Sequence, residues 1–335
     1  AATYEAALPL VLADPAVDSV IVLFVPPVVA TADDVAAAIV RAAGGATKPI
    51  LAVVVSGAGI PAALRQTDCP VAAFMYPESA ARALALAAER GDWLRREAGT
   101  VPAVDGIDRA RARVLIDSGA GEGWLDPTET RSLLEAYGIP LVSERCAATV
   151  EEAVAAARDL GFPVVVKSAI PGAHKTESGG VALGLTSVEE VRAAALRIGA
   201  PLLLQPMISD GVELLAGVVQ DPVFGPLVAF GPGGVLAELI GDTRFAIAPL
   251  TDVDADELVH GGKAGRLVAG FRGGPPADAA ALCDLIQRLA RLAEDNPEVA
   301  ELDLNPVLGL RDGCVAVDAR VRVHRLALTT DRKSW

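Results

Sequence analysis

Residues 1–97 alternate between short, continuously apolar runs and amphipathic segments. The apolar runs are rich in β-branched residues and predict strands at 18–27, 49–57 and 70–76. Apolar positions at helical spacing predict helices at 3–14, 31–43, 60–67 and 77–96. Strands without polar alternation, each followed by a helix, are typical of a parallel sheet covered on both faces. We therefore predict part of a doubly wound domain.

A change in composition separates this unit from a second one. Residues 98–122 carry many arginines and glycines, and we interpret them as a linker with one amphipathic helix near 108–118. From residue 123 onward, helices are predicted at 126–138, 151–161 and 187–198. Strands are predicted at 162–169, 201–208, 213–221, 226–234, 299–308 and 313–323, the last four pairing antiparallel. The expected fold is α/β, with a partial doubly wound parallel domain at 1–97 and an α+β domain at 123–335.

Composition narrows the classes of function. The chain is 52% hydrophobic, enough for two cores, but no apolar stretch reaches the ~18 residues of a membrane-spanning helix, so no membrane partner is expected. A net charge of −14 argues against sequence-independent nucleic-acid binding, which needs a basic surface. The four cysteines lack metal-site or disulfide spacing, so we expect reduced, mostly buried thiols in a cytoplasmic protein.

Two neighbouring features near the start of the second unit have the chemistry to bind phosphate. Lys167 ends an otherwise apolar strand, where a buried ammonium needs a negative partner; an internal ion pair and a phosphate ligand both satisfy that need. The following loop carries His174, Lys175 and the pair Gly179-Gly180, whose backbone N–H groups can converge on an anion. A neutral imidazole there can carry a phosphoryl group, but a surface turn with a solvated histidine explains the same residues equally well.

Oxygen-bearing and basic side chains follow later in the chain. Asn305 and Asp318 are predicted on adjacent strands, which can bring a carboxamide oxygen and a carboxylate to one point. Mg²⁺ takes such oxygens together with nucleotide phosphates, although a capped turn and a rim charge explain the same pair. Arg244 and Arg272 are candidate clamps for phosphate or carboxylate groups, against the simpler interpretation of surface arginines.

Three separated stretches, in this order, make a specific resemblance: 161–185, 211–234 and 299–307. Together they resemble the ATP-grasp domain of NDP-forming acyl-CoA synthetases, the acetate–CoA ligase (ADP-forming) group, over about 123–323. Residues 1–97 look like the later part of the flavodoxin-like ligase domain that precedes ATP-grasp in that family. The stretches 250–258 and 270–276 are most similar to actinobacterial forms fused to a GNAT-type, Pat-like acetyltransferase.

The resemblance implies roles for individual residues. The phosphates of ATP or ADP would contact Lys167, Gly179, Gly180 and the clamp candidates Lys175 and Arg244. The base and the rest of the nucleotide would contact Gln205, Met207 and Glu213. Mg²⁺ would be held by Asn305 and Asp318, and His174 would relay the phosphoryl group.

The family reaction is acyl-CoA + ADP + phosphate ⇌ acid + CoA + ATP. The chain shows no counterpart of the family's second phosphohistidine or of its CoA-binding Rossmann domain, so we expect it to perform the nucleotide half of the reaction as part of a longer protein. CoA and acyl-CoA would then be bound through the missing N-terminal domains.

Three departures from the family pattern keep alternatives open. Glu177 and Ser178 stand where the family loop usually has Asp and Val, and Ala246 stands where an arginine is common. These changes favour a regulatory nucleotide- or acyl-CoA-sensing module of a protein lysine acetyltransferase, and a scaffold that retains only the fold is a third alternative. The acyl substrate and the oligomeric state stay open, a homo-oligomer being one option.

Overall fold

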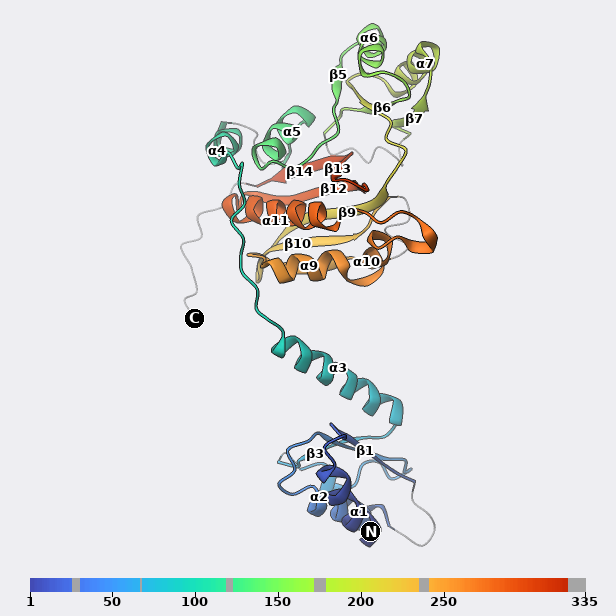
Figure 1. Ribbon diagram of the computed structural model, residues 1–335, viewed down its shortest axis with the longest axis vertical. Coiled ribbons are helices and arrows are strands. Elements are labelled where there is room, and N and C mark those ends of the chain that lie inside the picture. The colour runs from blue at the N-terminus through green and yellow to red at the C-terminus, as the bar shows by residue number, and fades with distance from the viewer. Residues whose placement is uncertain (26–30, 67, 119–122, 172–178, 235–240, 325–335) are drawn as a thin grey trace. The chain divides into compact units, whose positions relative to one another are not determined.

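The structure of the chain, a computed structural model, describes residues 1–25, 31–66, 68–118, 123–171, 179–234 and 241–324. The chain divides into two compact units, residues 1–97 and 98–335, and each unit has cores of its own (Figure 1).

The first unit is built on a three-stranded parallel sheet. Its strands are, in spatial order, β1 (Val20–Phe24), β2 (Ile50–Val54) and β3 (Val71–Phe74). All residues of the central strand β2 are buried, which explains why its sequence shows no polar alternation. The predicted parallel sheet is confirmed.

Helices cover both faces of this sheet. They are α1 (Ala2–Ala13), α2 (Ala32–Ala42), the short 3₁₀ helix η1 (Ala62–Leu64) and α3 (Pro77–Arg95). Leu8 of α1 and Val35 of α2 share one core with Val22 of β1. On the other face Ala80 of α3 packs with Val53 of β2.

The second unit contains a large seven-stranded sheet, called the large sheet below. Its strands are β4 (Gly123–Trp124), β9 (Val212–Asp221), β10 (Gly225–Pro232), β11 (Arg244–Ile247), β12 (Val299–Gly309), β13 (Cys314–Ala316) and β14 (Ala319–Val323). The spatial order is β11-β10-β9-β12-β14-β4, with β13 paired to β12, and every pairing is antiparallel. The predicted antiparallel pairing is thus confirmed.

Among the described residues, the helices that accompany this sheet are α4 (Arg109–Ser118), α5 (Pro127–Ala136), α9 (Asp252–His260), α10 (Gly262–Val268), the 3₁₀ helix η2 (Phe271–Gly273) and α11 (Ala279–Asp295). Figure 1 shows α9, α10 and α11 lying along one side of β9 and β10. Leu285 and Leu289 of α11 are fully buried against that face, together with Leu214 of β9 and Phe230 of β10.

A smaller four-stranded sheet, the small sheet, completes the second unit. Its strands are β5 (Arg145–Ala147), β6 (Val164–Ser168), β7 (Val181–Leu185) and β8 (Leu202–Pro206), in the order β5-β8-β6-β7. The helices α6 (Val150–Leu160) and α7 (Val188–Ile198) cover one face, on which Val164 and Val166 are buried. Because strand residues alternate between faces, Lys167 and Gln205 project from the other face.

The structure corrects three details of the sequence prediction. The single strand expected at 313–323 is interrupted at Val317 and Asp318, so β13 and β14 are separate strands. Helices α9, α10 and α11 had not been predicted. All four cysteines are free, but only Cys314 is buried, so the expectation of mostly buried thiols is wrong.

Helix α4 lies in the segment that we interpreted as a linker. Its residue Ala112 is fully buried and belongs to the main core of the second unit. Within the described part of the chain, no helix combines the length and the apolar character needed to cross a membrane.

Candidate functional site

Lys167 joins the small sheet to the large sheet. Its side chain leaves the open face of β6 and is nearly inaccessible to solvent, with 7% exposed. Its Nζ atom lies 3.7 Å from Asp318 Oδ1 and donates a hydrogen bond of 3.1 Å to the carbonyl oxygen of Val317. The negative partner that the sequence required for this buried ammonium is therefore Asp318 in the connection between β13 and β14.

Gln205 of β8 lies on the same open face and is 2% exposed. Its Nε2 atom donates to Glu144 Oε2 at 3.1 Å and to the Val317 carbonyl at 3.0 Å. Val317 O thus accepts hydrogen bonds from two polar side chains of the small sheet, Gln205 and Lys167.

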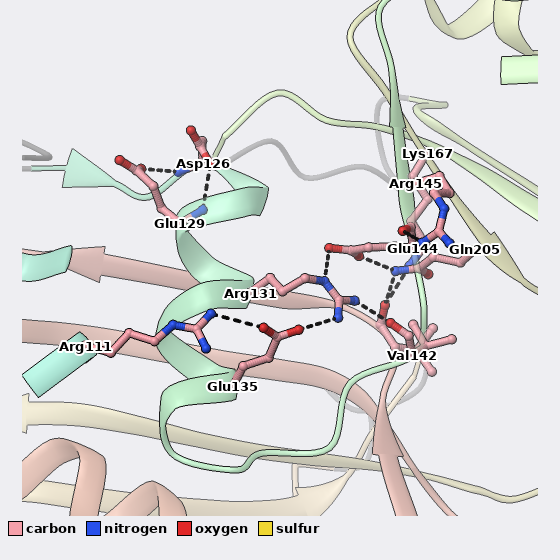
Figure 2. A network of polar contacts seen from close by, with 11 residues as sticks. Arg111, Asp126, Glu129, Arg131, Glu135, Val142, Glu144, Arg145, Lys167 and Gln205 are labelled. Carbon is pink, nitrogen blue, oxygen red and sulfur yellow. Dashed lines mark hydrogen bonds and ion pairs between the residues drawn. The ribbon is translucent and has the colours of Figure 1, made fainter. Parts of the chain in front are cut away.

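Arg131 of α5 supports this cluster from the side of the large sheet (Figure 2). It donates from Nε to Glu144 Oε1 at 2.8 Å, from Nη1 to Glu135 Oε1 at 3.1 Å, and from Nη2 to the Val142 carbonyl. Burial lowers the pKa of the guanidinium, but the hydrogen bonds and charges of Glu144 and Glu135 outweigh it and raise that pKa. Arg131 therefore stays a permanent cation inside the cluster.

The helix that carries Arg131 has a well-defined beginning. Asp126 caps α5 by accepting the backbone N–H of Glu129 at 2.8 Å, and the Glu129 carboxylate accepts the N–H of Asp126 at 3.0 Å. This capping box, with Pro127 in the first turn, fixes where α5 begins.

A pocket lies between α5, the β8 strand of the small sheet and the β13–β14 connection. Its lining includes Glu144, Leu203, Gln205, Val317 and Asp318. Apolar walls with a few convergent polar groups are typical of a small-molecule site.

Asn305 of β12 and Asp318 of the β13–β14 connection are neighbours through their backbones. The backbone N–H of Asn305 donates to the carbonyl of Asp318 at 3.1 Å, and Leu304 pairs with Ala319. Asn305 Oδ1 in turn accepts the N–H of Gly234 at 3.1 Å.

Gly234 also brings Glu213 to this point. It has a φ of +74°, and a Cβ atom added to it would lie 1.8 Å from Glu213 Oε2. The carboxylate of Glu213 therefore packs directly on the backbone whose N–H binds Asn305. The sequence analysis assigned no role to Gly234.

The donor set fits Mg²⁺ that arrives with phosphate. Mg²⁺ commonly takes one or two protein oxygens and completes its octahedron with water and phosphate oxygens. Asn305 and Asp318 offer two such oxygens. Among the described residues, no three or more His, Cys, Asp or Glu side chains are grouped to hold a metal alone.

The glycine pair lies beside the end of β6. The N–H of Ser168, which follows Lys167, donates to the carbonyl of Gly180 at 2.8 Å, and Gly179 has a φ of +69° with open space around its Cα. His174 and Lys175, and the departures Glu177 and Ser178, lie outside the described residues.

Three other candidates are placed away from these groups or are engaged within the protein. The N–H of Met207 donates to the carbonyl of Pro163 at 2.9 Å. The Arg244 side chain lies against Gly261. Arg244 is also paired with Phe230, whose side chain belongs to the core under the helices. Paired strand residues point to the same face, so Arg244 lies on the helix-covered face of the large sheet, opposite to Glu213. The phosphate-clamp predictions for Arg244 and for Arg272, whose guanidinium lies over the Phe271 ring, gain no support from their placement.

Comparison with known proteins decides the family. Residues 118–323 match the family model described as an ATP-grasp domain. The chain belongs to the ATP-grasp family. The α+β fold predicted for the second unit is therefore confirmed as an ATP-grasp fold.

Relatives of this ATP-grasp chain are ADP-forming acyl-CoA ligases. It is 37% identical over 230 residues to acetate–CoA ligase (ADP-forming) I subunit beta of Pyrococcus furiosus, covering 64% of this chain and 99% of that one. It is 35% identical over 271 residues to 4-hydroxybutyrate–CoA ligase (ADP-forming) of Nitrosopumilus maritimus, covering 76% of this chain but only 39% of that protein. The resemblance of residues 123–323 to the ATP-grasp domain of ADP-forming acyl-CoA ligases, inferred from sequence, is confirmed.

A solved structure gives the same result. The ATP-grasp chain is 40% identical to a chain of dinucleotide-forming acetyl-coenzyme A synthetase 1 from Candidatus Korarchaeum cryptofilum, with a TM-score of 0.56. The match covers 65% of this chain and 100% of that one. That protein was solved with coenzyme A and Mg-AMPPCP, its phosphohistidine segment pointing towards the nucleotide-binding site.

Proposed function

We propose that this ATP-grasp chain binds Mg²⁺–ATP or Mg²⁺–ADP and performs the nucleotide half of an ADP-forming acyl-CoA ligase reaction. The observation that carries the proposal is the meeting of Lys167, Asp318 and Asn305 where the small sheet faces the large sheet. A buried cation beside a carboxylate, with a carboxamide residue bonded to the same backbone, suits a phosphate group and its metal ion.

Each residue of the proposed site has its own role. Lys167 binds phosphate oxygens as a point charge, and Gly179 and Gly180 offer backbone next to it. Asn305 and Asp318 hold Mg²⁺, with Glu213 beside them; the bound ion would neutralise the charge that builds up on the transferred phosphoryl group. Gln205 and Met207 contact the base from β8 and the connection that follows it.

We assign the relay of phosphate to His174. An imidazole nitrogen attacks the γ-phosphorus of ATP, the bond to the β-phosphate oxygen breaks, and ADP leaves; the reverse step forms ATP. Support comes from the resemblance of the loop, and from the phosphohistidine segment named in the Korarchaeum structure. CoA and acyl-CoA would bind to domains outside this chain. The proposed location of the protein is the cytoplasm, where cysteines stay reduced, in agreement with its four free cysteines.

Nucleotide titration of the 335-residue chain tests the site. We expect ATP and ADP to bind with micromolar affinity only when Mg²⁺ is present, as measured by calorimetry. Lys167→Ala removes one charge-assisted contact and should weaken binding by ~1.5–3 kcal/mol. Lys48→Ala, in the first unit, is the control and should bind like wild type. Equal affinities of Lys167→Ala and wild type would show that the site is elsewhere.

A second candidate is a regulatory nucleotide- or acyl-CoA-sensing module of a protein lysine acetyltransferase, in a chain fused to a GNAT domain. Ala246 favours it, because this residue replaces a common family arginine and packs against the core of the second unit. Incubation with γ-labelled ATP separates the two. Relay through His174 predicts acid-labile label on wild type and on the control His324→Ala, but none on His174→Ala. Nucleotide binding without any label would favour the regulatory module.

A further inference from the structure

Both peptide groups that flank the Cα atom of Asp318 are held by hydrogen bonds. The carbonyl of the preceding group, Val317 O, accepts from Gln205 Nε2 at 3.0 Å and from Lys167 Nζ at 3.1 Å. The carbonyl of the following group, Asp318 O, accepts the backbone N–H of Asn305 at 3.1 Å. Because two fixed peptide planes define the φ and ψ angles of the residue between them, these bonds set the direction in which the Asp318 side chain leaves the backbone.

Of the two donors to Val317 O, Gln205 is the more firmly placed. Lys167 has a flexible stem and is also the proposed phosphate ligand. Gln205 is 2% exposed, and its Nε2 atom donates to Glu144 Oε2 at 3.1 Å as well. Since both partners of this nitrogen are acceptors, the amide cannot turn over without losing both bonds. The Glu144 carboxylate therefore keeps the amide nitrogen next to Val317 O.

Glu144 is itself held from two sides (Figure 2). Its Oε1 atom accepts Arg131 Nε at 2.8 Å. The backbone just before it is bound to β13, because the N–H of Val142 donates to the carbonyl of Ala316 at 3.0 Å. The side chains of Glu144 and Arg131 are 14% and 24% exposed, so water competes weakly for their hydrogen bonds. The hydrogen bonds thus close a ring that begins and ends at the carboxyl end of β13.

We propose that Glu144 is a positioning residue for the metal ligand Asp318. It acts through the Gln205 amide and the Val317 carbonyl, and Arg131 supports it. This inference rests on the proposed Mg²⁺–nucleotide site. Groups that orient a metal ligand commonly change metal affinity by about 10- to 100-fold, because the ligand has to be held within about 0.5 Å of its place. Without Glu144 the peptide group before Asp318 can rotate, and the carboxylate then moves off the ion.

The number of water molecules on the metal ion tests the inference. Mn²⁺ takes the same oxygen ligands as Mg²⁺, and pulsed EPR in D₂O counts the waters on Mn²⁺ in its complex with ADP and the full chain. Asp318→Ala is the reference variant, because the position that the carboxylate leaves is filled by about one added water. Glu144→Ala should show the same added water and bind Mn²⁺–ADP about tenfold more weakly than wild type.

Two further variants separate positioning from general damage. Gln205→Met removes the donor to Val317 O and leaves Glu144 bound to Arg131, so it should also add a water. Its loss of any contact with the base would change the affinity and not the water count. Glu135→Ala is the matched control: it removes ion pairs with Arg131 and Arg111 from the same network but does not touch Gln205, and it should keep the wild-type count. Thermal unfolding shows whether each variant is folded, and Gln205→Met decides if Glu144→Ala is not.

The outcomes distinguish the inference from the function on which it rests. If wild type does not bind Mn²⁺–ADP, or if Asp318→Ala leaves the water count unchanged, the proposed metal site fails and the inference fails with it. If Asp318→Ala adds a water but Glu144→Ala does not, the metal site stands and the positioning role of Glu144 is wrong. An equal gain of water in Glu135→Ala would mean that the whole network loosens, and this too would overturn the inference.

Discussion

Gly234 holds together several groups of the candidate metal site. Its N–H binds the side chain of Asn305, and its Cα lies under the carboxylate of Glu213. Asn305 is in turn bound through its backbone to Asp318. A glycine is needed here for two reasons, a φ of +74° and the lack of space for a Cβ atom.

Gly234→Ala should therefore displace Glu213 and Asn305 and weaken Mg²⁺-dependent nucleotide binding by at least about tenfold, roughly the worth of one hydrogen bond to a charged ligand. Gly225→Ala is a matched control, because Gly225 also has a positive φ, +80°, but no atom lies within 4 Å of its added Cβ. Both variants should lose about 1–3 kcal/mol of stability from backbone strain. If calorimetry finds equal nucleotide affinity for the two, the role of Gly234 in the site is refuted.

Lys167 shows how far single residues can be interpreted from sequence. A lysine in an apolar strand needs a negative partner, and this followed from desolvation alone. The identity of the partner did not follow, because Asp318 approaches only after the two sheets have packed. The Glu144–Arg131–Gln205 cluster was missed for the same reason: Glu144 is a single acidic residue in a connection, with no motif around it.

At the scale of helices and strands, local signals were sufficient where capping residues were present. Thr149 and Ser187 accept backbone N–H groups at the starts of α6 and α7, and both helices begin within one residue of the predicted start. The break between β13 and β14 was missed because no glycine or proline marks Val317 and Asp318. The burial of α4 depends on tertiary packing of Ala112, which an arginine-rich helix does not reveal.

The burial of both faces of the small sheet explains why the sequences of its strands indicate little about function. One face of β6 and β8 packs on α6 and α7, and on the other face Leu203 and Gln205 of β8 line the pocket. Val165 and Leu203, on the face turned away from α6 and α7, are both 3% exposed, so the strands are apolar on both sides. Polar residues appear only near the strand ends, as Lys167 and Gln205, and these are the residues that reach the site.

The whole molecule is acidic, with a net charge of −14, although its proposed ligand is a polyanion. The overall field therefore opposes the approach of free nucleotide, and binding has to depend on local cations and on Mg²⁺ carried by the phosphates. Lys167 is such a local cation, buried and oriented between the two sheets.

The two units have separate cores, and this predicts two thermal transitions. Ile39 of the first unit and Leu285 of the second are both fully buried, so Ile39→Ala and Leu285→Ala are chemically matched variants. Each should lose about 2–5 kcal/mol of stability in its own unit only.

Mg²⁺–ATP distinguishes the same two transitions. At a free concentration 100 times the dissociation constant it should stabilise the second unit by about 2.7 kcal/mol, because it binds only the folded site, and leave the first transition unchanged. Differential scanning calorimetry with and without nucleotide measures both effects. A single transition that shifts with either substitution would mean that the two units unfold as one. If nucleotide instead raises the temperature of the transition that Ile39→Ala lowers, the binding site is in the first unit.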